Sequence, residues 1–205
     1  AEVELLERIS SVLNDGKSVR SMGLSEEELL IIKQLGLLTG KPVIYATNVS
    51  EDDLANGNEW VEEVKKFASS DDAKVVVVSA QVESELVELS EAETQDFLEA
   101  LGVEEGGLKS LIRATYDLLG LRTYLTTGEQ ETRAWTIIAG MKAPQAAAVI
   151  HTDFEKKFIK AETISYQDLV TTGSKNAAKE KGLLRLEGKD YIVQEGDVIE
   201  FRTGA

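Results

Sequence analysis

The chain has 205 residues, of which 42% are hydrophobic and only two are prolines, so it can bury the core of one large or two small domains. This composition excludes an intrinsically disordered chain, and the absence of cysteine excludes disulfide bonds and thiolate metal sites. The longest apolar runs, at residues 75–78 and 146–150, are far shorter than the roughly 20 residues of a membrane-spanning helix. We therefore expect a globular protein of the reducing cytoplasm with no membrane partner.

The net charge of −15 is unevenly distributed along the chain. Residues 1–120 contain 10 Lys and Arg against 25 Asp and Glu, whereas residues 121–205 contain 12 of each kind. Such a step predicts two units with different surfaces, an acidic one that disfavours polyanions and a neutral one that can carry a local basic patch. We place the boundary between them near Gly120.

The beginning of the chain has the apolar periodicity of a helix. Apolar residues at helical spacing, from Leu5 to Leu13, predict a helix that stops before the turn at 14–16. Because the first residues have the pattern of the middle of an amphipathic helix, with neither Met nor a signal peptide, we expect the native protein to continue upstream. Ser25 and Glu28 form a capping box, which predicts the start of a second helix.

A strand, a helix and another strand follow in that order. A short β-rich run at 43–47 ends in a polar loop, a helical pattern covers 60–67, and four consecutive valines occupy 75–78. Such an unbroken β-branched run is typical of a buried strand covered on both faces, and the order of elements predicts a parallel pair. Two further helices, at 90–101 and 108–119, close the first unit.

Past Gly120 the pattern changes to short strands with a few helices between them. The expected strands are at 122–126, 132–138, 158–165, 184–186 and 198–201, and the expected helices are at 144–150 and 166–171. Mixed strands and helices within about 85 residues indicate a compact α+β domain.

Ligands of a parallel sheet bind in the loops at the carboxyl ends of its strands. Here these loops carry Asn48, Val49 and Glu51 after the first strand, and Ser79 and Ala80 after the second. An asparagine amide offers a donor and an acceptor that match the edge of either purine. GTPases usually place Asp where Glu51 stands, and the longer side chain should misplace the carboxylate, so strict selectivity for guanine is not expected. Taken alone, each loop is also consistent with an ordinary turn.

Several longer motifs surround these residues. The run Lys41-Pro-Val-Ile-Tyr-Ala-Thr-Asn-Val-Ser-Glu-Asp contains Asn-x-x-Glu, and Val75-Val-Val-Val-Ser-Ala-Gln-Val-Glu-Ser-Glu-Leu contains Ser-Ala. Beyond them come Leu118-Leu-Gly-Leu-Arg-Thr-Tyr-Leu-Thr-Thr-Gly, Arg133-Ala-Trp-Thr-Ile, Lys142-Ala-Pro-Gln-Ala-Ala and Ile150-His-Thr-Asp-Phe. Together these runs resemble the YchF family of Obg-like P-loop ATPases and GTPases, and the later ones resemble its TGS domain. The resemblance covers nearly the whole chain.

The fold that this resemblance implies is α/β. It is the C-terminal part of a P-loop NTPase parallel-sheet domain with a helical insertion, followed by an α+β β-grasp (TGS) domain. Residues 1–37 would be the returning segment of the insertion, 38–120 the C-terminal half of the nucleotide-binding domain, and 121–205 the TGS domain.

The implied function is a purine-nucleotide NTPase that favours ATP or accepts both ATP and GTP, linked to the ribosome and translation. The expected base contacts are Asn48, Val49, Glu51, Ser79 and Ala80. No Gly-x-x-x-x-Gly-Lys-Ser/Thr loop occurs in these residues, because Gly40 and Lys41 are followed by Pro42. We therefore expect the chain alone to be inactive, to contain no catalytic or metal-binding residue, and to involve Mg²⁺ only in the full-length protein.

A second class of function remains open, in which the chain is an autonomous TGS-containing module that binds RNA or protein and has no nucleotide function. In either class, Lys156, Lys157 and Lys160 form a candidate contact with ribosomal RNA or a ribosome-bound factor, and no DNA partner is expected. A solvated surface is an equally good interpretation of this cluster.

Other candidate residues favour structural roles. His151 has no nucleophile placed by the sequence and is expected to fix a turn by a hydrogen bond. The acidic runs at 26–28, 51–53 and 71–72 are expected to favour helix dipoles and solubility instead of holding a metal. Trp135 is expected in the core, or at a contact surface if it is half exposed.

Overall fold

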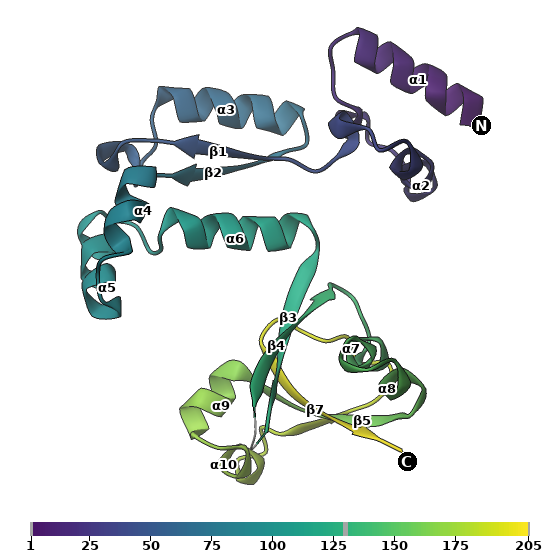
Figure 1. The fold of residues 1–205 in the computed structure, drawn as a ribbon, viewed down its shortest axis with the longest axis vertical. Coiled ribbons are helices and arrows are strands. Elements are labelled where there is room, and N and C mark those ends of the chain that lie inside the picture. The colour runs from purple at the N-terminus through teal and green to yellow at the C-terminus, as the bar shows by residue number, and fades with distance from the viewer. Residues whose placement is uncertain (1, 129–130, 205) are drawn as a thin grey trace. The chain divides into compact units, whose positions relative to one another are not determined.

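The computed structural model describes residues 2–128 and 131–204, and the chain divides into two compact units at Leu119 and Gly120. Figure 1 shows the elements of both units along the chain. None of the helices in the described ranges is long and apolar enough to cross a membrane.

The first unit contains helices around a short sheet. Its α-helices are α1 (Glu2–Asn14), α2 (Glu26–Leu35), α3 (Glu59–Ser70), α4 (Ala80–Leu86), α5 (Glu91–Ala100) and α6 (Gly107–Leu118). Its 3₁₀ helices are η1 (Val19–Met22), η2 (Leu38–Gly40) and η3 (Glu51–Asp53), and its strands are β1 (Ile44–Asn48) and β2 (Lys74–Val78).

The start of the chain folds as its pattern predicts. Leu5 and Ile9 of α1 are buried together with Val19 and Ile32, so α1, η1 and α2 share one small apolar core. The Ser25 hydroxyl accepts from the Glu28 backbone N–H at 3.3 Å, and the Glu28 carboxylate accepts from the Ser25 N–H at 3.0 Å. This reciprocal pair confirms the capping box, which satisfies two N–H groups that the helix itself cannot bond.

Strands β1 and β2 form the predicted parallel pair, with Tyr45 opposite Val75 and Asn48 opposite Val78. Helices α3 and α6 both pack against the pair, on opposite sides of it in Figure 1. The strands are less buried than expected: in β2 only Val76 is fully buried, and in β1 no residue is. The reason is that these two strands make a complete sheet within the described residues, so each keeps an open edge.

The second unit is a mixed sheet covered by short helices. Its elements are β3 (Leu121–Thr127), β4 (Thr132–Ile138), α7 (Ala143–Ile150), α8 (Thr152–Lys156), β5 (Phe158–Ser165), α9 (Tyr166–Thr172), α10 (Lys175–Glu180), β6 (Arg185–Glu187) and β7 (Asp197–Thr203). The strand order is β4-β3-β7-β5-β6, with β3 and β7 parallel and the other pairs antiparallel. The first and last strands of the unit therefore meet at its centre.

One apolar core holds the second unit together. Tyr124, fully buried on β3, donates a hydrogen bond from its hydroxyl to the Ala146 carbonyl of α7 at 3.0 Å. Its ring meets Phe201 of β7 edge to face, with the ring centroids 5.7 Å apart. Small alanines on the inner face of α7 let this helix lie close to the sheet. The predicted fold class, α/β followed by α+β, is confirmed.

Three short helices, α4, α8 and α10, were not expected from the sequence. Each has five to seven residues, too few for apolar periodicity to be recognised. The helix α4 matters for the candidate site, because it begins directly after β2 at the residues predicted to contact a base.

Candidate nucleotide-base site

The two loops predicted to bind a base lie at the same edge of the sheet. In the parallel register Asn48 is the partner of Val78, so the segments that follow β1 and β2 leave the sheet side by side. The Val49 N–H donates to the Val78 carbonyl at 2.9 Å and extends the pairing by one step. Parallel pairing thus brings together residues that are about 30 positions apart in the sequence.

Asn48 joins the two loops directly. Its side-chain Oδ1 accepts from the Ala80 backbone N–H at 2.9 Å. Because a backbone N–H can only donate, this contact fixes which end of the Asn48 amide is the oxygen. The oxygen thus has a protein partner, whereas the described residues offer no acceptor to Nδ2.

This geometry narrows the chemistry available to Asn48. The Nδ2 group can only donate, and N7 is an acceptor on both adenine and guanine. The two-point pairing expected from the sequence needs the amide oxygen as well, which already accepts from Ala80 and keeps one lone pair. Asn48 therefore presents a donor group for which both adenine and guanine have an acceptor.

Ser79 and Val49 have less to offer than the sequence suggests. Ser79 is only 1% exposed, and its hydroxyl accepts from the Val82 N–H at 3.5 Å as the N-cap of α4. Its side chain serves the helix and its carbonyl accepts from the Glu83 N–H at 2.9 Å, so this buried residue offers little to a ligand. Val49 is half-buried and its N–H is already bonded to Val78.

Glu51 is exposed at the start of η3, and its carboxylate has no hydrogen bond or ion pair with any described residue. The loop that presents it is held by Asp53, whose Oδ2 accepts from the Ser50 hydroxyl at 3.2 Å and from Asn58 Nδ2 at 2.8 Å. Asp53 therefore has a structural role within the acidic run 51–53, and Glu51 remains available.

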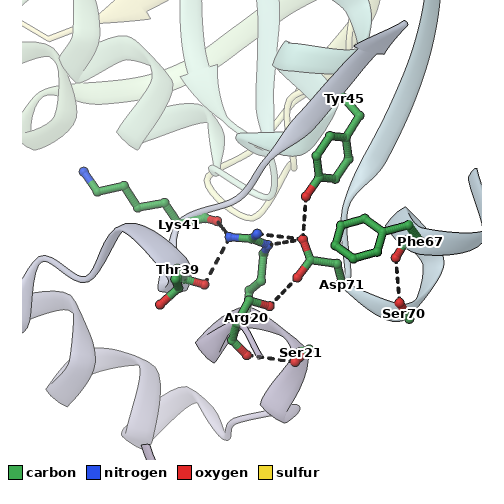
Figure 2. A network of polar contacts seen from close by, with 9 residues as sticks. Arg20, Ser21, Thr39, Lys41, Tyr45, Phe67, Ser70 and Asp71 are labelled. Carbon is green, nitrogen blue, oxygen red and sulfur yellow. Dashed lines mark hydrogen bonds and ion pairs between the residues drawn. The ribbon is translucent and has the colours of Figure 1, made fainter. Parts of the chain in front are cut away.

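The polar cluster shown in Figure 2 was missed by sequence reasoning. The sequence pattern placed Asp71 among the solvent-facing acids, but only 7% of this residue is exposed. Its Oδ2 accepts from Arg20 Nε at 3.0 Å, from Arg20 Nη2 at 2.6 Å and from the Tyr45 hydroxyl at 2.8 Å, and its Oδ1 accepts from the Ser18 hydroxyl. Burial alone would raise the pKa of Asp71, but the bonds from Ser18, Arg20 and Tyr45 outweigh burial and hold it below its usual range.

Comparisons with known proteins bear on the chain as a whole. Residues 121–204 match the family YchF-GTPase_C, described as "Protein of unknown function (DUF933)". The ribosome-binding ATPase YchF of Bacillus subtilis is 52% identical over 203 residues, which are 98% of this chain and 56% of that protein. The chain belongs to the YchF family.

More distant YchF relatives cover the same part. Obg-like ATPase 1 of Caenorhabditis elegans is 39% identical over 207 residues, covering all of this chain and 52% of that protein. The solved structure of the Schizosaccharomyces pombe YchF GTPase superposes with a TM-score of 0.79 at 36% identity, covering 97% of this chain and 53% of that one. The chain thus spans about half the length of these YchF proteins.

In the second unit of this YchF-family chain, basic side chains fall into two groups. Lys175 bonds to Glu162 and Glu200, and Arg202 Nε lies 3.2 Å from Glu162. Arg202 and then Lys175 lower the pKa of Glu162 to about 2 by hydrogen bonding. By contrast, Lys156, Lys157 and Lys160 have no ion pair within the described ranges, so their charge is not neutralised locally.

His151 has the structural role expected of it, whereas Trp135 is half-buried, the case in which the sequence allowed a contact surface. The His151 side chain is exposed, and its Nδ1 accepts from the Asp153 N–H at 3.2 Å as the N-cap of α8, which confirms the predicted turn bond. Trp135 is half-buried against the core, with Nε1 donating to Thr126 at 2.9 Å and the Arg133 guanidinium 4.1 Å from its ring centroid. The cation covers the face that would otherwise be available for stacking.

Residues 2–128 and 131–204 contain no group of three His, Asp or Glu side chains placed to hold a metal ion.

Proposed function

We propose that this chain supplies base recognition to a purine-nucleotide-binding P-loop NTPase, together with a C-terminal TGS domain that binds a macromolecule. The observation that carries the proposal is the bond between Asn48 Oδ1 and the Ala80 N–H, which leaves one amide donor at the carboxyl edge of a parallel sheet. The names of its relatives, ribosome-binding ATPase and YchF GTPase, support nucleotide binding and hydrolysis by the full-length protein.

The proposed site favours ATP or accepts both ATP and GTP. A single Nδ2 donor on Asn48 serves N7 of either base. Selectivity then depends on Glu51, the exposed carboxylate of the neighbouring loop. Guanine offers N1 and N2 donors to a carboxylate and adenine does not, but the glutamate side chain is one methylene longer than the aspartate that GTPases use. A misplaced carboxylate gives guanine little advantage.

Two substitutions at Asn48 in the full-length protein test this assignment. Asn48→Ala removes both amide groups, whereas Asn48→Asp keeps an acceptor for the Ala80 N–H, loses the donor and adds a negative charge. Both should weaken ATP and GTP equally, by roughly 1–3 kcal/mol, or about 5- to 150-fold. Isothermal calorimetry measures this, with Asn176→Ala, an exposed asparagine of α10, as the matched control. Unchanged affinity in Asn48→Asp would show that the donor does not contact the base.

A third substitution tests the loop of Glu51. Glu51→Asp shortens the carboxylate toward guanine N1 and N2 and should move the ATP:GTP affinity ratio toward GTP. Glu63→Asp, at an exposed position on α3, is the control that should leave the ratio alone. An unaltered ratio in Glu51→Asp would remove that residue from the proposed site.

Phosphate chemistry, and with it Mg²⁺, is proposed to come from residues outside these 205. No phosphate-binding loop occurs in the sequence, so the chain alone lacks the amides and the lysine that stabilise charge on a transferring phosphoryl group. We expect no release of phosphate from ATP or GTP in an assay with excess chain. Turnover that co-purifies with the chain would contradict this expectation.

The second unit is proposed to make the macromolecular contact, through Lys156, Lys157 and Lys160. The observation that favours them is that these ammonium groups are unpaired in the described residues and lie within five positions of one another, on α8, at its C-cap and on β5. By contrast, Lys175 and Arg202 are engaged with carboxylates. Other lysines, Lys179, Lys181 and Lys189, also have no ion pair with the described residues, so a control that uses them compares position and not pairing. Unpaired lysines can bind phosphates with release of counterions. The name of the Bacillus subtilis relative points to the ribosome, and so to the cytoplasm.

Charge reversal tests the basic contact. Replacing Lys156, Lys157 and Lys160 by Glu should reduce co-sedimentation of the full-length protein with ribosomes at low salt and leave nucleotide affinity unchanged. Reversal of Lys179, Lys181 and Lys189 provides a control with the same change in charge. Equal losses in both variants would indicate a nonspecific effect of charge, and no loss in either would favour a protein partner without RNA contacts.

A further inference from the structure

We propose that Asp71 is a positioning residue that couples the helical segment of residues 2–40 to the strand that carries Asn48. The inference rests on the proposed nucleotide function, and it connects the proposed base site to the helical segment of the same unit. The geometry behind it is the carboxylate of Figure 2, which binds the helical segment and the strand at the same time.

On the helical side, Asp71 is bonded to η1. Arg20 directs Nε and Nη2 to the Asp71 carboxylate, and its remaining nitrogen, Nη1, donates to the Thr39 carbonyl at 3.1 Å and to the Lys41 carbonyl at 3.4 Å. The Ser18 hydroxyl bonds to the other carboxylate oxygen. Arg20 therefore also holds the residues that lead from η2 into β1, and the whole guanidinium is used.

On the strand side, the same carboxylate oxygen accepts from the Tyr45 hydroxyl at 2.8 Å. Tyr45 lies on β1 three residues before Asn48, about 10 Å along an extended strand. Its ring is held edge to face by Phe67 of α3, with centroids 5.8 Å apart. A displacement of Tyr45 is therefore transmitted along β1 to the end where Asn48 bonds to Ala80.

The turn between α3 and β2 restricts where the Asp71 carboxylate can lie. Asp71 is the C-cap of α3, and the next residue, Asp72, has a positive φ of 50°, the one such non-glycine position in the described chain. Asp is one of the side chains that tolerate this left-handed conformation, so Asp72 closes the tight turn between α3 and β2. The carboxylate cannot easily follow Arg20 away from Tyr45 without disturbing that turn.

When two binding events favour the same conformation of a protein, each increases the affinity of the other by the same factor. The docked helical segment and the Asn48–Ala80 bond share the Asp71 carboxylate through Arg20 and Tyr45. Nucleotide binding at Asn48 should therefore stabilise the helical segment, and release of the segment should weaken nucleotide binding. A purely structural contact would instead change stability without any dependence on nucleotide.

Tyr45→Phe separates these cases, because it removes the hydroxyl that joins strand to carboxylate and keeps the ring against Phe67. The control is Tyr166→Phe, which removes an exposed hydroxyl with no hydrogen bond in the described residues. Hydrogen exchange of the full-length protein is measured with and without saturating ATP, followed at the amides of α1 and α2. ATP affinity is measured for each variant by calorimetry.

In the unmodified protein and in Tyr166→Phe, ATP should slow exchange in α1 and α2 by about fivefold or more, the lower end of ordinary coupling. Tyr45→Phe should still bind ATP but lose this protection, while the amides of the Asn48 loop stay protected. Protection of the helices that survives in Tyr45→Phe, or that is absent from the unmodified protein although it binds ATP, overturns the coupling. Failure of the unmodified protein to bind ATP overturns the proposed function and the coupling together.

Discussion

The strength of the Arg20–Asp71 pair can be measured by a double-mutant cycle. Asp71→Ala leaves the Arg20 guanidinium, whose side chain is 14% exposed, without its anion, and also deprives the Ser18 and Tyr45 hydroxyls of their acceptor. Removing one partner of a buried pair costs about 3–5 kcal/mol, because the other charge stays buried and unpaired.

Arg20→Ala should cost less. Asp71 then keeps the Ser18 and Tyr45 hydroxyls as donors, so its carboxylate remains partly satisfied. We expect about 2–3 kcal/mol for this change. The double variant should be little worse than Asp71→Ala alone, which corresponds to a coupling energy of about 2–3 kcal/mol between the two side chains.

The assay is native-state hydrogen exchange in increasing urea, followed at the amides of β1 and β2. This measurement reports the first unit directly, and the strands of the second unit provide an internal reference. Additive losses in the double variant, or a loss below about 1 kcal/mol in Asp71→Ala, would refute the reasoning, since either result means that the carboxylate is solvated and not engaged with Arg20.

Two further predictions concern stability. Arg202 and Lys175 lower the pKa of Glu162 from 4.5 to about 2, so its carboxylate stabilises the folded state fully above about pH 4.5 and loses this effect as pH falls to 2. Glu162→Gln should therefore lower the free energy of unfolding by about 1–2 kcal/mol at pH 7, and urea titrations should show this loss disappearing between pH 4.5 and 2. A loss that stays constant with pH would contradict the ion pairs. Gly107→Ala would place a methyl group 3.0 Å from the Val78 Cα atom and should lower the stability of the first unit by about 1–3 kcal/mol. The control is Gly106→Ala, whose methyl group meets the flexible Glu83 carboxylate and should change stability little. Equal urea midpoints for the two variants would show that α6 can shift to accommodate the methyl group.

Much of the local structure followed from the sequence because it depends on neighbouring residues. The capping box at Ser25 joins groups three positions apart, and the four valines of β2 favour an extended backbone whatever surrounds them. The parallel order also placed Asn48 and Ser79 at one edge of a sheet before any contact was known. These inferences need periodicity, capping and connection rules only.

Tertiary structure decided what each polar group does. Asp71 and Asp72 are adjacent acids in the sequence, yet Asp71 is buried because Ser18 and Arg20 lie against it from more than 50 positions away. Likewise, the bond from Ala80 selects which end of the Asn48 amide faces outward, and the start of α4 consumes the hydroxyl of Ser79. A residue type fixes which hydrogen bonds a side chain can make, but its partners are chosen only when distant segments meet, because burial and pairing depend on the whole chain.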